Sequence, residues 1–217
     1  MDEIERLKGS IKEQSSSEVI PLFPLPIYKT NIGREVTKQE QDEIDTIVSE
    51  KLANRELGSD TPKDLSIDRY LLRQKSFLSI QSFIERHLKE FVTVIMGVDT
   101  TKTGWSPHIT KSWLNVYKPN NYDPLHRHYK CIISGVFYIN CLKLSDKPDG
   151  IIFDAPSHHI LQQFELPIAQ DTKFSDKPQF VPVVGGDLIL FPSNVKHGVN
   201  LNETSDQTRI SLSFDSI

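Results

Sequence analysis

The sequence has few cysteines and no long apolar run. Only two of its 217 residues are cysteines, and both lie in CIISGVFYINCL (131–142), which is typical of one continuous strand. In such a strand Cys131 and Cys141 are about 33 Å apart, too far for a disulfide. No apolar run approaches the roughly 20 residues that span a bilayer, and the polar N-terminus lacks an apolar signal core. These absences predict a cytoplasmic protein with reduced thiols and no membrane partner.

The chain also lacks an excess of positive charge. Its formal net charge is -4, which argues against nucleic acid as a nonspecific partner. The apolar fraction of 37% is enough to bury a core, so intrinsic disorder is excluded. The length predicts a single domain.

The patterning changes once along the chain, near Gly97. Residues 1–19 form a polar N-terminal arm, and residues 20–217 form the single domain. Val19 to Ile32 is apolar but rich in proline, which predicts an edge strand or an extended segment that wraps around the domain. Helical periodicity dominates about 37–97: Thr37 and Glu40 make a capping-box pattern, and a second apolar stripe runs from about 76 to 96. Short runs rich in Val, Ile, Phe and Tyr dominate about 105–217. They predict strands near 109–118, 131–142, 150–154, 179–184, 187–191, 196–200 and 208–214.

This order of elements predicts an α+β fold. Helices come first and antiparallel strands follow, as in a jelly roll with N-terminal helices packed outside it. In the strand near 109–118, Trp113, Asn115 and Tyr117 alternate with Leu114 and Val116, which gives the strand two chemically different faces.

Three histidines stand where a metal site is expected. His126 and His128 are two residues apart, so an extended chain places both imidazoles on one face. The preceding Asn-Asn-Tyr-Asp-Pro sequence is typical of a turn, which puts the pair at the mouth of a strand. His197 begins another short strand. Two neighbouring nitrogen ligands and a distant third are what an open metal site needs.

An anion-binding pair follows the third histidine. Arg209 comes twelve residues after His197, and Ser211 shares its strand face. A fixed arginine with a serine beside it can hold a carboxylate by charge-assisted hydrogen bonds. Metal ligands and such a pair on neighbouring strands would bind a keto acid end to end.

With these motifs the chain resembles the Fe(II)- and 2-oxoglutarate-dependent oxygenases, in particular a compact bacterial and viral branch. The resemblance rests on LFPLPIY (22–28), SWLNVYKPNNYDPLHRH (112–128), SGVFYIN (134–140), GGDLILFPSNVKHGV (185–199) and RISLSF (209–214). It implies a double-stranded β-helix, which is a cupin-like jelly roll. It also implies Fe(II) as cofactor, 2-oxoglutarate and O₂ as cosubstrates, and hydroxylation of an unactivated C–H bond with release of succinate and CO₂.

The resemblance also assigns roles to individual residues. His126 and His197 match the two iron-binding histidines of the family. Arg209 and Ser211 match the R-x-S that holds the distal carboxylate of 2-oxoglutarate. Tyr117 matches a tyrosine that lines the cosubstrate pocket, and Asn115 shares its face. No catalytic residue is expected beyond the metal ligands.

The sequence departs from the family at one position. Most members carry H-x-D or H-x-E, whereas His128 stands in the carboxylate position here, which leaves three neutral imidazoles one negative charge short. Three interpretations are open. His128 is the third ligand; or His128 points to the substrate and water takes the third position; or Asp123 or Asp154 supplies the carboxylate through a bent loop.

Two other functions stay open beside the oxygenase. One is a three-histidine iron dioxygenase that needs no keto acid, and the other is a noncatalytic jelly-roll binding module. We expect the loop 155–178 and the helices before residue 100 to shape the substrate mouth. The sequence does not distinguish a small-molecule substrate from a peptidyl one, and it does not predict the oligomeric state.

Overall fold

The computed structural model describes residues 24–53, 69–142, 148–154, 178–204 and 206–217. The predicted arm at 1–19 and most of the predicted loop at 155–178 lie outside these residues. The division into an arm and one domain therefore stays a prediction.

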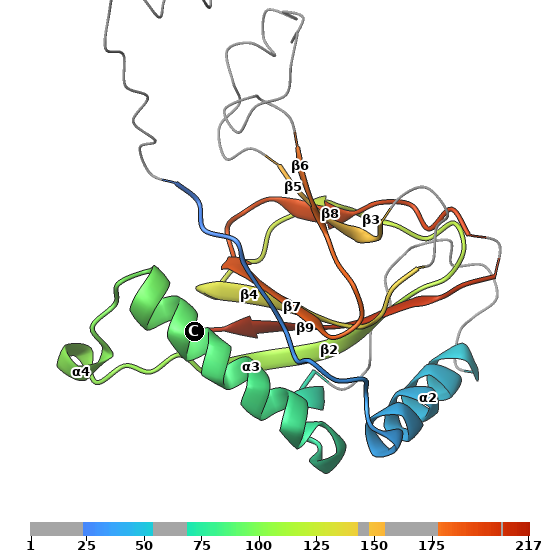
Figure 1. The fold of residues 1–217 in the computed structure, drawn as a ribbon, viewed down its shortest axis with the longest axis horizontal. Coiled ribbons are helices and arrows are strands. Elements are labelled where there is room, and N and C mark those ends of the chain that lie inside the picture. Colours follow the sequence, from blue (N-terminus) through green and yellow to red (C-terminus); the bar gives the residue numbers. More distant parts are fainter. Residues whose placement is uncertain (1–23, 54–68, 143–147, 155–177, 205) are drawn as a thin grey trace, which may run out of the picture.

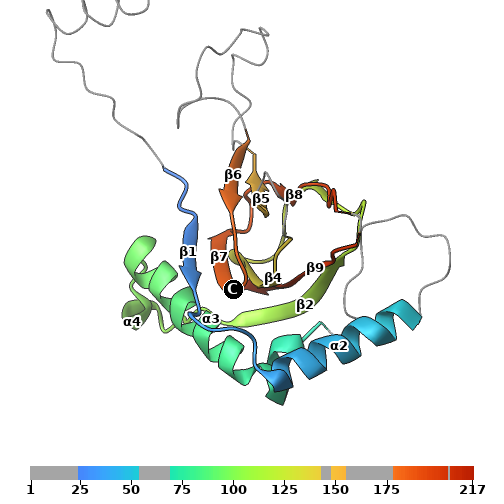
Figure 2. The same ribbon diagram turned by 45° about the vertical axis from the view of Figure 1, so that its right-hand side comes forward.

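Nine described strands form two antiparallel sheets (Figures 1 and 2). The five-stranded sheet has the order β1 (Tyr28–Asn31), β7 (Asp187–Pro192), β4 (Ile133–Asn140), β9 (Arg209–Ser216), β2 (Ile109–Tyr117). The four-stranded sheet has the order β3 (Asp123–His126), β8 (His197–Val199), β5 (Gly150–Phe153), β6 (Gln179–Pro182). The predicted α+β jelly roll is confirmed, and the proline-rich N-terminal segment supplies an edge strand, β1, which among the described strands pairs with β7 alone.

Helices cover the outer face of the five-stranded sheet (Figure 2). Helix α2 (Lys38–Ala53) begins with the predicted capping box, in which the Glu40 N–H donates to Thr37 Oγ1 at 3.2 Å and the Thr37 N–H donates to Glu40 Oε2 at 2.7 Å. The helix predicted at about 76–96 is less regular. A 3₁₀ turn (Lys75–Phe77) precedes α3 (Leu78–Glu90), and a π-helical turn (Phe91–Ile95) ends it. Two short elements complete the set, a 3₁₀ turn at Leu71–Arg73 and α4 (Thr100–Thr103).

The side chains of β9 alternate between the core under the helices and the cavity between the two sheets. Ile210, Leu212 and Phe214 pack into the core beneath the helices. Each such buried side chain contributes roughly 1.5–3 kcal/mol to stability. Arg209 and Ser211 point the other way, toward the four-stranded sheet, because successive strand residues face opposite sides.

Strand β2 follows the same rule, as predicted. Leu114 and Val116 pack with the helices, while Trp113, Asn115 and Tyr117 line a cavity between the sheets. The site is therefore built on the inner face of strands whose outer face is fixed by the core.

The predicted strand at 131–142 is too long. Strand β4 covers only Ile133–Asn140, because Lys130 has a positive φ of 61° that turns the chain before the strand begins. Cys131 and Cys141 fall outside the strand and are both free thiols. Among the described helices, none has the length and apolarity to cross a membrane.

Candidate functional site

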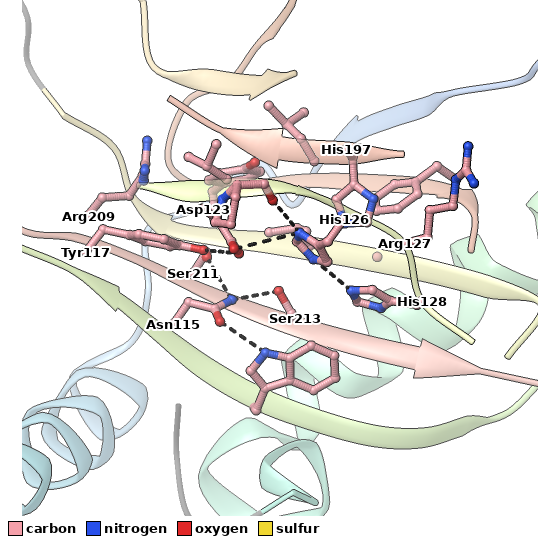
Figure 3. Close-up of a pocket in the computed structure, with 18 of the residues that line it drawn as sticks. Asn115, Tyr117, Asp123, His126, Arg127, His128, His197, Arg209, Ser211 and Ser213 are labelled. Atoms are coloured by element: carbon pink, nitrogen blue, oxygen red, sulfur yellow. Dashed lines mark hydrogen bonds and ion pairs between the residues drawn. The ribbon is translucent and has the colours of Figure 1, made fainter. Parts of the chain in front are cut away.

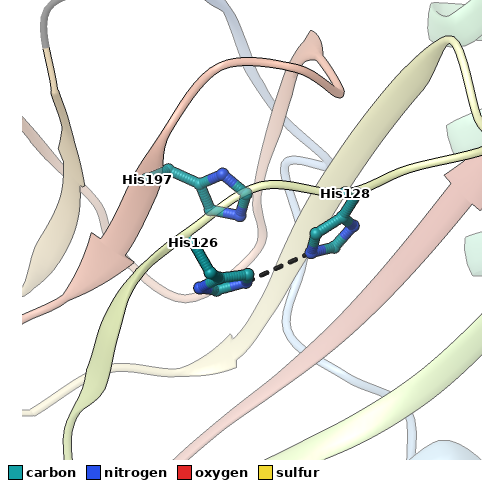
Figure 4. A group of neighbouring side chains, drawn as sticks. All are labelled: His126, His128 and His197. Atoms are coloured by element: carbon teal, nitrogen blue, oxygen red, sulfur yellow. Dashed lines mark hydrogen bonds between the residues drawn. The ribbon is translucent and has the colours of Figure 1, made fainter.

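The three predicted histidines meet where β3 and β8 pair (Figure 4). His126 ends β3 and lies opposite His197, the first residue of β8, in the antiparallel register. His128 follows two residues later, outside the strand, so the predicted pair does not share one strand face. One ligand atom from each histidine lies within 4.8 Å of the other two.

Each of these imidazoles has its Nδ1 fixed by an oxygen acceptor. Nδ1 of His126 donates to the Pro124 carbonyl at 2.8 Å, and Nδ1 of His197 donates to the Val195 carbonyl at 2.9 Å. Nδ1 of His128 donates to Asp215 Oδ1 at 2.6 Å. When Nδ1 of a neutral imidazole carries the hydrogen, Nε2 has a free lone pair. This is the tautomer that binds a metal ion through Nε2.

In these tautomers the Nε2 lone pairs of His126 and His128 repel each other, and a bound cation removes the repulsion. Nε2 of His126 and Nε2 of His128 are 3.2 Å apart, with no hydrogen for either to donate. Two lone pairs at that distance repel each other, whereas a metal ion can accept both. The donor set therefore fits a divalent transition metal that prefers imidazole ligands.

Burial of His197 makes the stability of the metal-free protein pH-dependent. Burial lowers the pKa of His197 to about 3, and the charges of His126 and His128 act in the same direction. In the unfolded chain its pKa is about 6.5, so below that pH the unfolded state binds a proton that the folded state does not. The stabilisation by neutral His197 is present above pH 6.5 and is lost as the pH falls toward 3.

We therefore expect the free energy of unfolding to fall by up to about 1.4 kcal/mol per pH unit in this window from His197 alone. Urea unfolding of the metal-free protein at several pH values measures the slope, and His197→Gln serves as the reference because it removes this proton site. Equal slopes in the two proteins would contradict the assignment.

Asp215 stands behind His128 and is buried. Its carboxylate accepts hydrogen bonds from His128 and from Ser134 Oγ, the latter at 2.9 Å, and Lys111 Nζ lies 3.3 Å away. Burial alone would raise the pKa of Asp215, but the hydrogen bonds and positive charge of His128, the Ser134 hydroxyl and Lys111 together lower it. The group is thus an anion, and it orients His128 as carboxylates do behind metal-binding histidines.

Asp215→Asn is expected to weaken metal binding by about 10- to 100-fold, because it removes the negative charge and the fixed orientation behind His128. Isothermal titration of the metal-free protein with Mn(II) measures the change. Asp187→Asn is the matched control, since Asp187 is also buried but pairs with Lys29 on the edge of the sheet. Equal losses in both variants would indicate a general structural effect.

A cavity of about 420 Å³ opens beside the histidines, and Figure 3 shows the residues around it. At one end lies Arg209, whose side chain is 1% exposed. Its Nη1 donates to Asp149 Oδ1 at 2.5 Å, and its guanidinium lies 4.5 Å from the centre of the Tyr117 ring. Arg209 Nε and the Tyr138 hydroxyl have no hydrogen-bond partner although both are buried. Because buried polar groups are normally paired, these two donors mark a place for an acceptor.

Asp149, Tyr138 and Asp215 are candidate site residues that the sequence did not reveal. Asp149 precedes β5 in the other sheet, so its contact with Arg209 depends on the packing of the two sheets. The sequence did contain a signal for Tyr138. It lies in SGVFYIN directly after the core residue Phe137, so its side chain is expected on the opposite face of the strand.

The other predicted cosubstrate residues share this cavity. The Tyr117 hydroxyl donates to Asp123 Oδ2 at 3.1 Å. The Asn115 amide is engaged at both ends, since its oxygen accepts from Trp113 Nε1 at 3.0 Å and its nitrogen donates to Ser213 Oγ at 2.7 Å. Asn115 thus holds the cavity wall in place.

The two aspartates considered as a third ligand lie elsewhere. Asp123 approaches His126 at Nδ1, 3.7 Å away, on the side opposite to Nε2. Asp154 accepts from Lys196 Nζ at 2.9 Å. A second possible group, His128 with Cys131 and Asp215, uses the Nδ1 side of the same His128. Of the described residues, His128 is therefore the one that completes the cluster with His126 and His197.

The fold and site together are those of a double-stranded β-helix with an open three-histidine centre beside a buried arginine. Residues 111–215 match the model of the family described as "Putative 2OG-Fe(II) oxygenase". The jelly roll is therefore similar to those of the 2OG-Fe(II) oxygenases, and the match supports the iron and 2-oxoglutarate predicted from the sequence. A comparison with curated proteins finds no match.

Solved structures show the same fold at low sequence identity. A prolyl-4-hydroxylase from Pseudomonas putida has a TM-score of 0.54 and 12% identity, over 88% of this chain and 92% of that one. HygX from Streptomyces hygroscopicus, with nickel and 2-oxoglutarate bound, has a TM-score of 0.52 and 11% identity, over 88% and 82%. The viral collagen prolyl hydroxylase of Paramecium bursaria Chlorella virus-1, as a 2-oxoglutarate complex, has a TM-score of 0.51 and 8% identity, over 88% and 94%.

Proposed function

We propose that the protein is an Fe(II)- and 2-oxoglutarate-dependent oxygenase that hydroxylates an unactivated C–H bond and releases succinate and CO₂. The observation that carries this proposal is the placement of two sites in one cavity. Three imidazole nitrogens converge at its histidine side, and buried donors without partners converge at its Arg209 end. The prolyl hydroxylases that share the fold give hydroxylation as the expected outcome.

His126, His128 and His197 would hold the iron, which when bound supplies the redox chemistry that activates oxygen. The protein orients all three imidazoles by binding their Nδ1 atoms. His128 stands where most relatives place a carboxylate, but Asp215 provides a negative charge directly behind His128. This charge offsets the deficit expected from three neutral ligands.

Arg209 and Tyr138 would hold the distal carboxylate of 2-oxoglutarate, with Ser211 beside them on the inner face of β9. Arg209 Nε and the Tyr138 hydroxyl are both donors, so one carboxylate satisfies both. Asp149 acts as a positioning residue, since its ion pair holds the guanidinium in a buried place where water competes weakly. Tyr117 packs against the guanidinium and closes this end of the cavity.

Turnover tests the proposal directly. With Fe(II), 2-oxoglutarate and O₂ supplied, the protein is expected to form succinate, and omission of either Fe(II) or 2-oxoglutarate is expected to abolish it. Succinate formation that continued without added iron and in the presence of a chelator would contradict the proposal.

The three-histidine set favours a second candidate, an iron dioxygenase that binds its substrate directly to the metal and uses no keto acid. Arg209 and Tyr138 argue against it, because that reaction provides no acceptor for their buried donors. Oxygen uptake with candidate substrates, measured with and without 2-oxoglutarate, separates the two functions. A noncatalytic binding module is the weaker third candidate, since such a module has no need of three oriented imidazoles.

A further inference from the structure

Two further arginines line the same cavity, away from the Arg209 end. Arg127 directly follows the ligand His126, and Figure 3 shows its side chain on the far side of the histidines from Arg209. Arg69 is held at the edge of β2, where its carbonyl accepts the Ser112 N–H at 2.7 Å. Trp113, the residue after Ser112, lines the cavity beside His128.

Neither guanidinium has a partner among the residues that the structure describes. Other arginines of the chain are engaged. Arg34 makes a bidentate pair with Glu40, Arg73 lies over Tyr70, Arg86 lies over Phe83, and Arg209 pairs with Asp149. Arg69 and Arg127 are both exposed, so water satisfies them, and their donors are free to receive a ligand.

The carboxylates of the cavity do not neutralise this pair. Asp123 is the only acidic residue among the described lining residues, and it accepts from Tyr117 and lies against His126. Asp149 is committed to Arg209. The chain as a whole is negative, with a net charge of -4, yet among the described residues this cavity is lined by two arginines that have no acidic partner. Two positive charges that line one cavity attract an anion from solution.

The size of the cavity indicates which molecule these arginines meet. At about 420 Å³ the cavity is near the lower end of the range for ligand pockets, roughly 300–1,000 Å³. It has room for a small dicarboxylate and the reacting part of a second molecule. The remainder of that second molecule must lie at the mouth, where Arg69, Arg127 and Trp113 are placed.

We propose that the substrate carries an oxyanion group, a carboxylate or a phosphate, which Arg69 and Arg127 bind at the cavity mouth. This inference rests on the proposed function, because it takes the Arg209 end to be filled by 2-oxoglutarate. A planar guanidinium matches both oxyanions in a bidentate manner, and a charge-assisted hydrogen bond is about twice as strong as a neutral one.

Binding to the complex of the protein with Fe(II) and 2-oxoglutarate, kept anaerobic, tests the proposal. The probes are N-acetyl amino acids with a free carboxylate, the corresponding primary amides, and phenyl phosphate. Isothermal titration is expected to show that the wild-type protein binds the best carboxylate or phosphate probe about 10- to 100-fold more tightly than a neutral amide. Tighter binding of phenyl phosphate would identify a phosphate, and tighter binding of the N-acetyl amino acids would identify a carboxylate.

Variants show whether the two arginines cause this preference. The double variant R69Q/R127Q is expected to lose it, and R69K/R127K is expected to keep part of it. R73Q, which removes a nearby exposed arginine outside the cavity, is expected to leave it unchanged. A wild-type protein without the preference, or an R69Q/R127Q variant that retains it, would overturn the inference.

The affinity for 2-oxoglutarate itself, measured in the same variants, separates this inference from the proposed function. If the wild-type protein binds no 2-oxoglutarate, the proposed function fails. If R69Q/R127Q weakens 2-oxoglutarate binding as strongly as it weakens probe binding, the arginines serve the cosubstrate and the inference alone fails. Unchanged 2-oxoglutarate affinity together with lost probe selectivity supports both.

Discussion

His126→Ala is expected to lower the affinity for Fe(II) by more than about 100-fold. The loss of a residue behind a ligand costs about 10- to 100-fold, and the loss of a ligand itself costs more. The variant removes one of the three imidazole ligands of the cluster. It also leaves His128 Nε2 without the His126 Nε2 atom that lies 3.2 Å from it. His126 is the most suitable of the three for this test, since its side chain is 36% exposed and its removal leaves no buried void. Anaerobic isothermal titration with Fe(II) measures the affinity.

His108→Ala is the matched control for this experiment. His108 is an exposed histidine before β2, with Nδ1 near the Ser106 carbonyl, and it does not line the cavity. Its removal is expected to leave Fe(II) affinity unchanged. His197→Ala and His128→Ala should reproduce the loss seen for His126→Ala. If His128→Ala alone bound iron normally, the third position would belong to water or to another group.

Arg209→Gln is expected to weaken 2-oxoglutarate binding by about 100-fold or more, because a buried charge-assisted hydrogen bond from Arg209 Nε is lost. The same change leaves Asp149 as a buried anion without its partner. Breaking a buried ion pair in this way costs about 3–5 kcal/mol of stability. A single variant therefore mixes a binding effect with a folding effect.

The double variant R209Q/D149N separates the two effects. It removes both charges of the pair, so its free energy of unfolding is expected to return toward that of the wild type, while 2-oxoglutarate binding stays weak. Urea unfolding and anaerobic titration with 2-oxoglutarate measure the two quantities on the same samples. Recovery of 2-oxoglutarate affinity in the double variant would show that Arg209 acts only through stability.

The sequence predicted β2 and β9 well because their patterning carries two kinds of information. Along β2 and β9 the residues alternate between an apolar face under the helices and a polar face toward the cavity. That alternation gave the strand positions and the shared face of Arg209 and Ser211. The capping box at Thr37 and Glu40 likewise fixed the start of α2, since the motif is local.

The residues that support the site could not be predicted in the same way. Asp215 meets His128 across 87 positions of the sequence, and Asp149 meets Arg209 across 60. Such contacts depend on strand register and on the packing of the two sheets, which no local pattern encodes. Both are ordinary aspartates in the sequence, and only their burial and partners reveal their roles.

The choice of third ligand illustrates the same limit. The candidates His128, Asp123 and Asp154 all lie near His126 or His197, along the chain or across the predicted sheet. The structure distinguishes them by side-chain direction: Nε2 of His128 faces Nε2 of His126, whereas Asp123 faces the opposite nitrogen and Asp154 pairs with Lys196. These directions depend on the turn at Pro124 and on the end of β3 at His126.

One measurement tests the central proposal most directly, the anaerobic titration of the metal-free protein with Fe(II) and then with 2-oxoglutarate, followed by visible absorption. We expect a weak charge-transfer band to appear only when both are present, and to be lost in His126→Ala and in R209Q/D149N. Iron binding without the band would contradict the use of 2-oxoglutarate and favour the three-histidine dioxygenase. Absence of iron binding would contradict the metal centre itself.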